Sequence, residues 1–384
     1  MVRRRGSALT ALNRTAAILI ALAGLVFLGF RFRSNFSDAG RGMNDFMNVY
    51  TGARLVGTPD QFYSRKYAED ELTVTGWVLP AQLRYLRWPV FAFVSRPLTA
   101  LSYAAAYHVW QALLLAALLG FWWLWPEPGR DALLVAACWS IPLVTSILNG
   151  KDVIFLMLFL AGLWRFHESR PWLAGLCLAL CALKFNLFFL MPVVLIAQRK
   201  WRVAAWAAAG VLALLGISTA VSTDRWIPRF IDFALNDVAA KQPYTMSSFV
   251  ALFAGLPHAG TWELAGGAVI AAMVAWLSLR GSFSFALSAA LVGGFLTSHH
   301  AYLFDLLLLL PVLVVILRTA ASTAVRLFAG LLLSPLPFLV SPNAPLLAPA
   351  PLLLLLLLIA LVMEHATQTG EGALSTGTPA STLD

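Results

Sequence analysis

The sequence predicts an all-α polytopic membrane protein, and two observations carry this fold class. Of the 384 residues, 60% are hydrophobic and only 12% are charged, and the mean hydropathy is +0.78, far outside the range of soluble globular domains. The apolar residues are also gathered in runs of about 15 to 22, the length at which a helix crosses a bilayer. A water-soluble protein is therefore excluded.

The basic residues agree with this class. A formal net charge of +9 would suit nucleic-acid binding in a soluble domain, but here Arg and Lys are scattered between the apolar runs, as topology signals are. We therefore expect membrane lipids as partners and no nucleic acid.

The first apolar run, Thr15 to Phe30, follows Arg3-Arg4-Arg5 and so has the shape of a secretory signal peptide. The residues after it, Arg31 to Asn35, offer no small-x-small cleavage site. We expect an uncleaved first span.

Twelve apolar runs are candidates for membrane helices, in a bundle expected to hold about 10 to 13 of them. They lie at residues 14–31, 102–125, 132–148, 153–166, 172–184, 186–197, 203–221, 261–279, 283–298, 302–317, 324–340 and 346–363. The runs on either side of Lys184, and those on either side of His299, are short and closely joined. Each pair can also be read as one broken helix.

The loop charges predict a cytoplasmic N-terminus. With that orientation the short outer loops carry only Lys151 and Lys184, which satisfies the positive-inside bias. The short inner loops carry Arg130, Arg165, Arg170, Arg199, Lys200, Arg202, Arg280, Arg318 and Arg326.

We expect residues 1–366 to form one membrane domain, and residues 367–384, rich in Gly, Ser and Thr, to form a disordered cytoplasmic tail. Two outer loops are predicted to be structured, at 32–101 and 222–260. The second contains an amphipathic segment, 226–238, typical of an interfacial helix. In the first, the apolar segment 89–101 is interrupted by Arg96 and Pro97, which indicates a re-entrant or interfacial piece.

Several signatures of soluble enzymes are missing. There is no Walker loop, no G-x-G-x-x-G after a strand, no H-E-x-x-H and no cysteine cluster. The one acidic run, Glu69-Asp70-Glu71, is more simply a solvated loop. We therefore expect no metal and no cofactor, and the pattern favours metal-independent chemistry on a monophosphate.

Asp45 is the acidic residue that we single out first. It precedes a short helical pattern for which Asn44 is a candidate N-cap. The apolar positions of that pattern are Phe46, Val49, Tyr50 and Ala53. A carboxylate at a helix N-terminus is explained equally by the helix dipole. What favours catalysis is that the predicted topology puts Asp45 on the same outer face as the charged turns described next.

Those turns carry the other ionisable residues near membrane depth, where a charge costs about 2.5 to 3.5 kcal/mol. Lys184 interrupts an apolar run and either snorkels to the headgroups or binds a ligand. The cluster His299-His300-Ala-Tyr302-Leu-Phe-Asp305 lies between two runs. Lys151 and Asp152 either pair with each other or join the same site.

Five motifs follow one another between about residues 40 and 310. They are Asp45-Phe-x-x-x-Tyr50-x-x-Ala53-Arg54-x-x-Gly57 with Gln61-Phe-Tyr63, then Tyr85-x-x-x-Pro89 with Arg96-Pro97-Leu98, Asn149-Gly150, Ala174 to Lys184 with Arg199-Lys-Trp201, and His299-His-Ala-Tyr302-Leu-Phe-Asp305. In this order they resemble glycosyltransferase family 87, the polyprenol-phosphate-mannose-dependent mannosyltransferases of the GT-C superfamily. The chain departs from the family at Phe185, where Pro is common, at Lys151, where Gln is common, and at Asn44, where many GT-C enzymes have a second acidic residue.

The resemblance implies a GT-C-type bundle in a bacterial inner (cell) membrane with its active site facing outward, and an inverting sugar transfer. The donor is expected to be a polyprenyl-phosphate sugar, mannose first, and the acceptor a hydroxyl of a lipid or glycan. Asp45 is expected to be the catalytic base, and the prenyl chain to lie in a groove beside 226–238. Candidates for binding the donor phosphate are Lys184, His299, His300, Arg96 and Lys151, and further candidate site residues are Tyr50, Arg54, Tyr302 and Asp305.

Two other functions remain open at this point. A transporter or flippase for a polyprenyl-linked lipid would use the same basic residues, but it would need polar residues all the way across the membrane. A non-catalytic envelope scaffold would leave Asp45 far from the histidine turn.

Overall fold

The computed structural model describes residues 2–39, 44–58, 62, 63, 69, 73, 85–126, 129–222, 225–236, 243, 246–339 and 348–375. Within these ranges the chain is helical, and its one β-bridge joins Met246 to Tyr302. The all-α fold class is therefore confirmed. The helices up to the middle of the chain are α1 (Val2–Ala39), α2 (Phe46–Leu55), α5 (Pro89–Ser95), η1 (Arg96–Ala100), α6 (Tyr103–Leu124), α7 (Arg130–Ala137), α8 (Ile141–Leu148), α9 (Val153–Phe166), α10 (Pro171–Leu180), η2 (Cys181–Phe188) and α11 (Met191–Ala197). The remaining ones are α12 (Trp201–Ser222), α13 (Trp226–Asn236), α14 (Phe249–Phe253), α15 (Ala259–Arg280), α16 (Phe283–Thr297), η4 (Leu303–Leu309), α17 (Leu310–Thr319), α18 (Thr323–Leu333), α19 (Leu336–Leu339) and α20 (Pro349–Ser375).

Six helices of the described part are long and apolar enough to span a membrane, and a seventh span is present if the bent pair α7 and α8 counts as one. The six are Thr15–Ser34, Tyr103–Leu124, Pro171–Phe188, Trp201–Ser222, Ala259–Arg280 and Pro349–Thr367. The other runs predicted as spans form shorter helices, such as α9, α16 and α18. Apolar length alone overestimates full spans because breaks divide several runs; α7 and α8, for example, meet at 66°.

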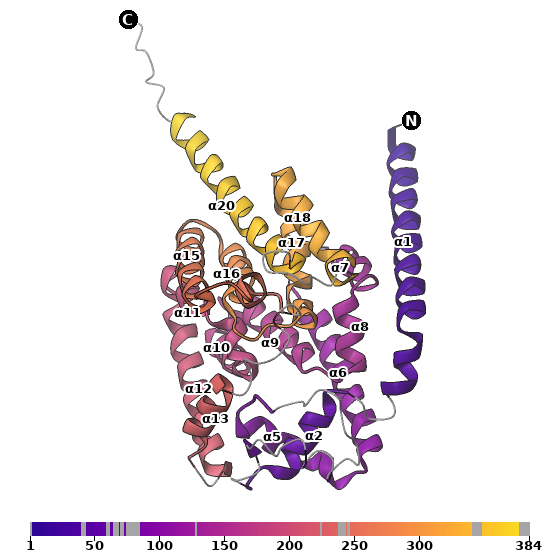
Figure 1. Ribbon diagram of the computed structural model, residues 1–384. Helices are drawn as coiled ribbons and strands as arrows, with labels where there is room; N and C mark the ends of the chain where they lie inside the picture. Colours follow the sequence, from indigo (N-terminus) through magenta and orange to yellow (C-terminus); the bar gives the residue numbers. More distant parts are fainter. Residues whose placement is uncertain are drawn as a thin grey trace, which may run out of the picture.

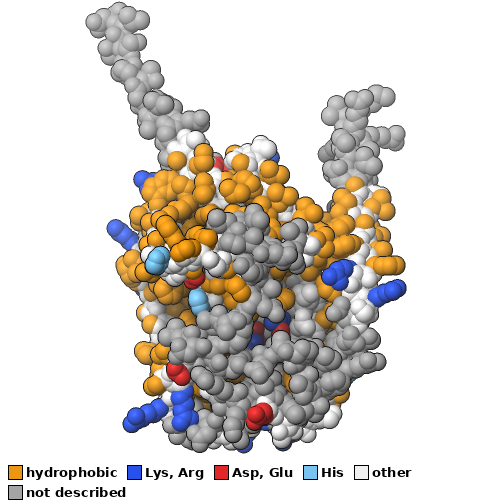
Figure 2. Space-filling view, viewed as in Figure 1, with side chains coloured by type: hydrophobic (Ala, Val, Ile, Leu, Met, Phe, Trp, Pro, Cys, Tyr) orange, Lys and Arg blue, Asp and Glu red, His pale blue; other side chains and the backbone are white. Residues whose placement is uncertain are grey.

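The molecule has two distinct ends (Figure 1). The start of α1 and the end of α20 point to the top of the view, whereas α2 and α5, which lie in the segment predicted as the first outer loop, are at the bottom. Apolar side chains cover the upper part of the face shown in Figure 2. Both ends of the described chain are therefore remote from the part that contains Asp45.

The two loops that were predicted to be structured contain helices, with altered boundaries. Helix α1 continues to Ala39, eight residues into the predicted first loop, and that loop then forms α2, α5 and η1. The segment 89–101 is a short α-helix followed by a 3₁₀ turn, as its Pro97 and Arg96 suggested. Helix α13 confirms the predicted amphipathic helix up to Asn236; residues 237 and 238 lie outside the described part.

The apolar face of α13 has one strip buried against the protein and another strip exposed. Trp226 and Phe230 are buried against the protein, where Trp226 packs on Trp88, while Ile227 and Ile231 are exposed. A helix with one apolar strip on the protein and another turned outward is suited to the membrane surface.

The predicted disordered tail requires a correction. Helix α20 extends to Ser375, so residues 367–375 are helical, and residues 376–384 lie outside the described part. Extending a formed helix by one residue costs far less than starting one, so a polar segment directly after a membrane helix continues it.

The centre of the bundle is α16, in which every residue from Ala286 to Leu296 is buried. A helix that is apolar all round is stable only when enclosed on all sides. Gly294 lets η2 approach it, because a Cβ there would collide with the carbonyl oxygen of Leu187. This close packing fixes the Lys184 break beside the turn that follows α16.

Candidate functional site

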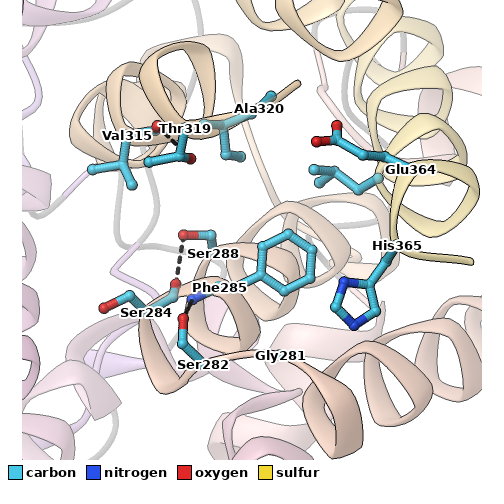
Figure 3. A pocket seen from close by; sticks show the side chains of 12 residues that line it. Gly281, Ser282, Ser284, Phe285, Ser288, Val315, Thr319, Ala320, Glu364 and His365 are labelled. Atoms are coloured by element: carbon cyan, nitrogen blue, oxygen red, sulfur yellow. Dashed lines mark hydrogen bonds between the residues drawn. The ribbon is translucent and has the colours of Figure 1, made fainter. Parts of the chain in front are cut away.

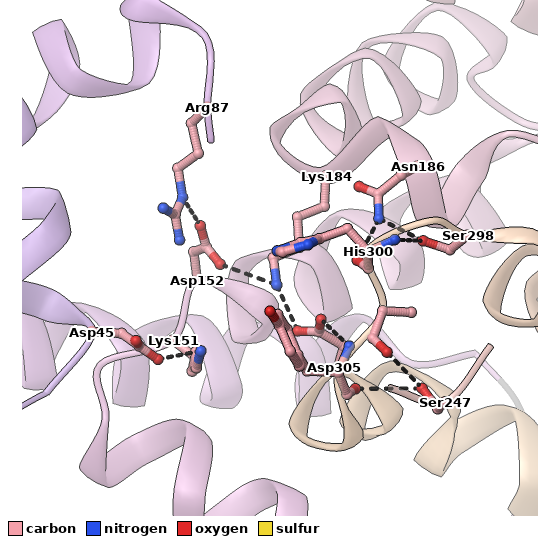
Figure 4. A network of polar contacts seen from close by, with 12 residues as sticks. Asp45, Arg87, Lys151, Asp152, Lys184, Asn186, Ser247, Ser298, His300 and Asp305 are labelled. Atoms are coloured by element: carbon pink, nitrogen blue, oxygen red, sulfur yellow. Dashed lines mark hydrogen bonds and ion pairs between the residues drawn. The ribbon is translucent and has the colours of Figure 1, made fainter. Parts of the chain in front are cut away.

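Asp45 lies directly before α2 and does not cap it. The capping bond comes from Asn44, whose Oδ1 accepts the backbone N–H of Phe46 at 3.1 Å and also the hydroxyl of Tyr103 at 3.1 Å. Asp45 makes no side-chain cap hydrogen bond and instead forms an ion pair with Lys151 (Figure 4). Asp45 therefore occupies the N-terminus of α2, where the helix dipole favours a carboxylate, and its side chain pairs with a cation instead of capping the helix.

The turn between α8 and α9 brings Lys151 to Asp45. The backbone N–H of Phe46 donates to the carbonyl of Asn149 at 3.1 Å, which ties the start of α2 to this turn. Gly150 has a φ of +67°, and a Cβ there would lie 2.8 Å from Cβ of Phe46. Only glycine permits both this left-handed backbone and this close approach. The Lys151 ammonium lies 4.4 Å from the centre of the Phe304 ring, a cation–π contact.

Asp152 holds two other cations in place. Its Oδ2 contacts Nε of Arg87, and its Oδ1 lies 4.0 Å from Nζ of Lys184. Its side chain is only 2% exposed. Burial by itself would raise the pKa of Asp152, but the positive charges of Arg87 and then Lys184 outweigh it and lower the pKa of this carboxyl. The alternative in which Lys151 and Asp152 simply pair with each other is wrong: Lys151 pairs with Asp45.

Lys184 stands at the predicted helix break. Its backbone is non-helical, with φ −137° and ψ 64°, inside the 3₁₀ segment η2. Nζ of Lys184 lies 2.5 Å from Oδ1 of Asp305, whose side chain is 1% exposed. Asp305 in turn accepts the backbone N–H of Tyr302 at 3.2 Å through Oδ2. The lysine therefore bridges two buried carboxylates, Asp305 and Asp152, rather than snorkelling to the headgroups.

The two histidines lie in different surroundings. His300 lies beside the charged network formed by Asp45, Arg87, Lys151, Asp152, Lys184 and Asp305. Asn186 donates to the carbonyl of His300 at 2.7 Å, and the His300 ring packs edge-on against Tyr302 with centroids 4.7 Å apart. Burial, and then the charge of Lys184, lowers the pKa of His300 to about 4. His299 points to Glu263, with Nδ1 3.3 Å from Oε2, and is 56% exposed. The structure thus brings one of the two predicted histidines to the site.

The remaining candidate residues fall into two groups, those inside the network and those outside it. Tyr50 is buried and donates its hydroxyl to the carbonyl of Leu101 at 2.9 Å, which holds α2 against η1. Arg54 and Arg96 are exposed, and no hydrogen bond or ion pair among the described residues joins either of them to the network. Tyr302 and Asp305 are part of it.

Arg87 is the residue that sequence reasoning missed. It occupies an unspecified position of the Tyr85-x-x-x-Pro89 motif, and its charge did not distinguish it from the many other basic residues of the loops. A usable signal was its place between two aromatic residues, Tyr85 and Trp88, two residues before the proline that starts α5. Its partner Asp152 is 65 residues away, so the pairing itself has no sequence signature.

An apolar cavity of about 440 Å³ ends at this network. Arg87 and Asp152 line it together with apolar side chains of α5, α9, α10 and α12, among them Val90, Val94, Phe155, Leu180 and Leu214. Beside α13, the space bordered by Trp226 and Arg229 measures only about 10 Å³, far less than this cavity. A second cavity of about 490 Å³, between η2, α11 and α12, is lined by apolar residues throughout.

A cavity of about 410 Å³ with several polar side chains in its lining lies elsewhere, where the beginning of α16 meets the end of α17 and the middle of α20 (Figure 3). Glu364 and His365 point into it from α20. It is separated from the network by the length of α16, about 22 Å for 15 residues. It contains none of the predicted site residues.

The network therefore combines three carboxylates, Asp45, Asp152 and Asp305, with three cations, Arg87, Lys151 and Lys184. No group of three or more His, Cys, Asp or Glu arranged to hold a metal occurs among the residues that the structure describes. Chemically, the site offers a carboxylate able to accept a proton and, beside it, cations suited to a phosphate. The apolar cavity next to them suits a hydrocarbon chain.

Comparison with known proteins assigns the family. The sequence model of glycosyltransferase family 87 matches residues 85–311, more than half of the chain, and this range includes Arg87, Asp152, Lys184 and Asp305. Asp45 lies before it. No curated protein and no solved structure matches the chain significantly. The chain belongs to glycosyltransferase family 87.

Proposed function

We propose that this glycosyltransferase moves a sugar, with mannose as the first candidate, from a polyprenyl-phosphate donor to a hydroxyl of a lipid or glycan acceptor. One observation carries the proposal: the cavity of about 440 Å³ is apolar along its walls and has Arg87 and Asp152 at its polar end. A ligand that matches such a site has a hydrocarbon chain and an anionic head, as a polyprenyl phosphate does.

In the reaction, Asp45 accepts the proton of the acceptor hydroxyl while the hydroxyl oxygen attacks the anomeric carbon. The bond between that carbon and the phosphate oxygen breaks, and its electron pair stays on the phosphate. The phosphate gains one negative charge, so Arg87 and Lys184 stabilise the transition state more than the bound donor. Attack from the face opposite the leaving group inverts the anomeric centre.

The orientation supports a GT-C-type enzyme in a bacterial inner membrane, with its active site facing outward. The loop charges favour a cytoplasmic N-terminus, and in Figure 1 the start of α1 lies at the end of the molecule opposite α2. Asp45, next to α2, then faces the periplasm, where polyprenyl-linked donors are used by enzymes of the resembled type.

The alternatives of a transporter and a scaffold are less well supported. Family membership indicates sugar transfer. Asp45 and the histidine turn, which a scaffold would leave apart, are linked through Lys151, whose ammonium contacts both Asp45 and the Phe304 ring.

The test is a transferase assay with purified protein and polyprenyl-phosphate mannose. Replacing Asp45 with Asn should lower turnover by about 10² to 10⁴, the usual worth of a general base. Asp131→Asn is the matched control, because Asp131 is exposed in the first turn of α7. Full activity of Asp45→Asn would remove Asp45 as the base, and an inactive wild type with this donor would contradict the donor class.

A further inference from the structure

We infer that Lys151 is a movable counter-ion, held by Asp45 in the resting site and transferred to the donor phosphate when the donor binds. Asp45 is then free to act as a base only after the donor has arrived. The inference rests on the proposed function and goes beyond it by assigning an order to the two substrates.

The charge balance is the first reason. The three carboxylates and three cations of the network formally cancel, and each carboxylate contacts at least one cation. A polyprenyl-phosphate sugar brings one further negative charge. A cation that leaves its carboxylate for the phosphate offsets this added charge most directly.

Lys151 is the cation whose ion pair is the easiest to give up. Lys184 contacts two carboxylates, and Arg87 contacts a carboxylate that is almost fully buried. Among the described residues, the ion pair of Lys151 runs to Asp45, whose side chain is 18% exposed and so is more easily rehydrated. The phosphate-binding end of the cavity is one residue away along the chain, at Asp152.

The surroundings allow the side chain to move while its backbone stays. The turn is anchored by the bond from Trp110 Nε1 to the carbonyl of Gly150, at 2.9 Å, and by the contact of Gly150 with Phe46. The lysine stem has four flexible carbons. The Phe304 ring contacts the ammonium through a cation–π interaction, which can stabilise the charge while it is away from Asp45.

The chemical consequence follows from the ion pair. While the ammonium contacts Asp45 Oδ2, the acceptor hydroxyl competes with a cation for the carboxylate. Once the ammonium moves to the phosphate, the carboxylate is free, and the same charge neutralises the phosphate as the anomeric bond breaks.

The experiment is a double-mutant cycle on the binding of polyprenyl phosphate alone, which needs neither acceptor nor turnover. Asp45→Asn should tighten binding about tenfold, because Lys151 no longer has to leave a carboxylate. Lys151→Gln should weaken binding about tenfold. In the Lys151→Gln background, Asp45→Asn should have little further effect, and Lys151→Arg should bind within about threefold of wild type because it keeps the charge.

Two results would contradict the inference while leaving the donor class intact. In one, Asp45→Asn leaves the affinity of the wild-type background unchanged. In the other, Asp45→Asn tightens binding equally with and without Lys151, which would mean that the Asp45 carboxylate simply repels the phosphate. Wild-type protein that does not bind polyprenyl phosphate would instead overturn the proposed donor and this inference together. Equal melting temperatures of the variants check that each remains folded.

Discussion

Lys184 and Asp305 are 121 residues apart in the sequence, yet Nζ of the lysine lies 2.5 Å from Oδ1 of the carboxylate. This ion pair joins the break in the span Pro171–Phe188 to the turn after α16. Because the Asp305 side chain is 1% exposed, removal of Lys184 would leave a buried carboxylate without its counter-ion. The pair therefore contributes to the fold, and under the proposed function Lys184 also binds the donor phosphate.

The first prediction separates these two roles. Lys184→Met leaves Asp305 without its counter-ion and should destabilise the protein by about 3 kcal/mol or more, measured as a lower melting temperature in detergent. The double variant Lys184→Met with Asp305→Asn should recover most of that stability. It should not recover activity, because the cation for the phosphate is still missing. Recovery of both would mean that Lys184 has only a structural role.

The second prediction concerns pH. The folded-state pKa of His300, about 4, lies below the value of about 6.5 of an unfolded chain. Its neutral form therefore contributes stability that is complete above about pH 6.5 and is lost as the pH falls toward 4. In His300→Gln, the melting temperature should fall less between pH 7 and pH 4.5 than in wild type.

His299 is the matched control for that experiment, because its shift has the opposite sign. The hydrogen bond to Glu263 raises the pKa of His299, so its contribution is present at low pH and is lost as the pH rises through the raised value. His299→Gln should therefore make the loss of stability at low pH steeper. An identical pH profile in both variants would contradict the assignment of the two environments.

A third prediction tests the turn that carries Lys151. Gly150→Ala places a Cβ 2.8 Å from Cβ of Phe46 on a left-handed backbone, so the turn must shift away from α2. The strain should cost about 1 to 3 kcal/mol, and turnover should fall because Lys151 and Asp45 no longer align. Gly330→Ala in α18 is the control: nothing lies within 4 Å of the position that a Cβ would occupy there, and the change should be neutral or slightly stabilising. Unchanged turnover in Gly150→Ala would show that the exact position of this turn is unimportant.

A fourth prediction locates the prenyl chain. Val94 of α5 lines the cavity that ends at Arg87 and is itself exposed, so Val94→Trp should fold while reducing the volume of that cavity. Each excluded methylene group costs about 0.8 kcal/mol, so KM for a long-chain donor should rise about tenfold or more, and KM for a short-chain donor much less. Ile196→Trp makes the same change in the second apolar cavity and should leave both values unchanged. A larger effect of Ile196→Trp would assign the chain to that cavity instead.

Parts of the fold and site were predictable from local pattern. Apolar runs fix where helices form, because each run must be buried in lipid or protein, and the break at Lys184 was visible as a charge inside such a run. Asn44 was predicted to be the N-cap of α2; the N-cap position is held by Asp45, one residue later, and the Asn44 side chain accepts the N–H of Phe46, the first residue of the helix. Full membrane spans were overestimated because hydropathy does not register a bend such as that between α7 and α8.

The sequence by itself determined that this chain is a helical membrane protein of glycosyltransferase family 87, because composition, run length and motif order are properties of the chain read in one dimension. Only the tertiary structure decided the pairing of the charges: Lys151 with Asp45, Arg87 with Asp152, and Lys184 with Asp305. Partners 65 to 121 residues apart meet only after the helices pack. Inside the protein the dielectric constant is low, so the energy of each charge pair depends strongly on distance. Those distances are set by how the helices pack, which no local sequence pattern encodes.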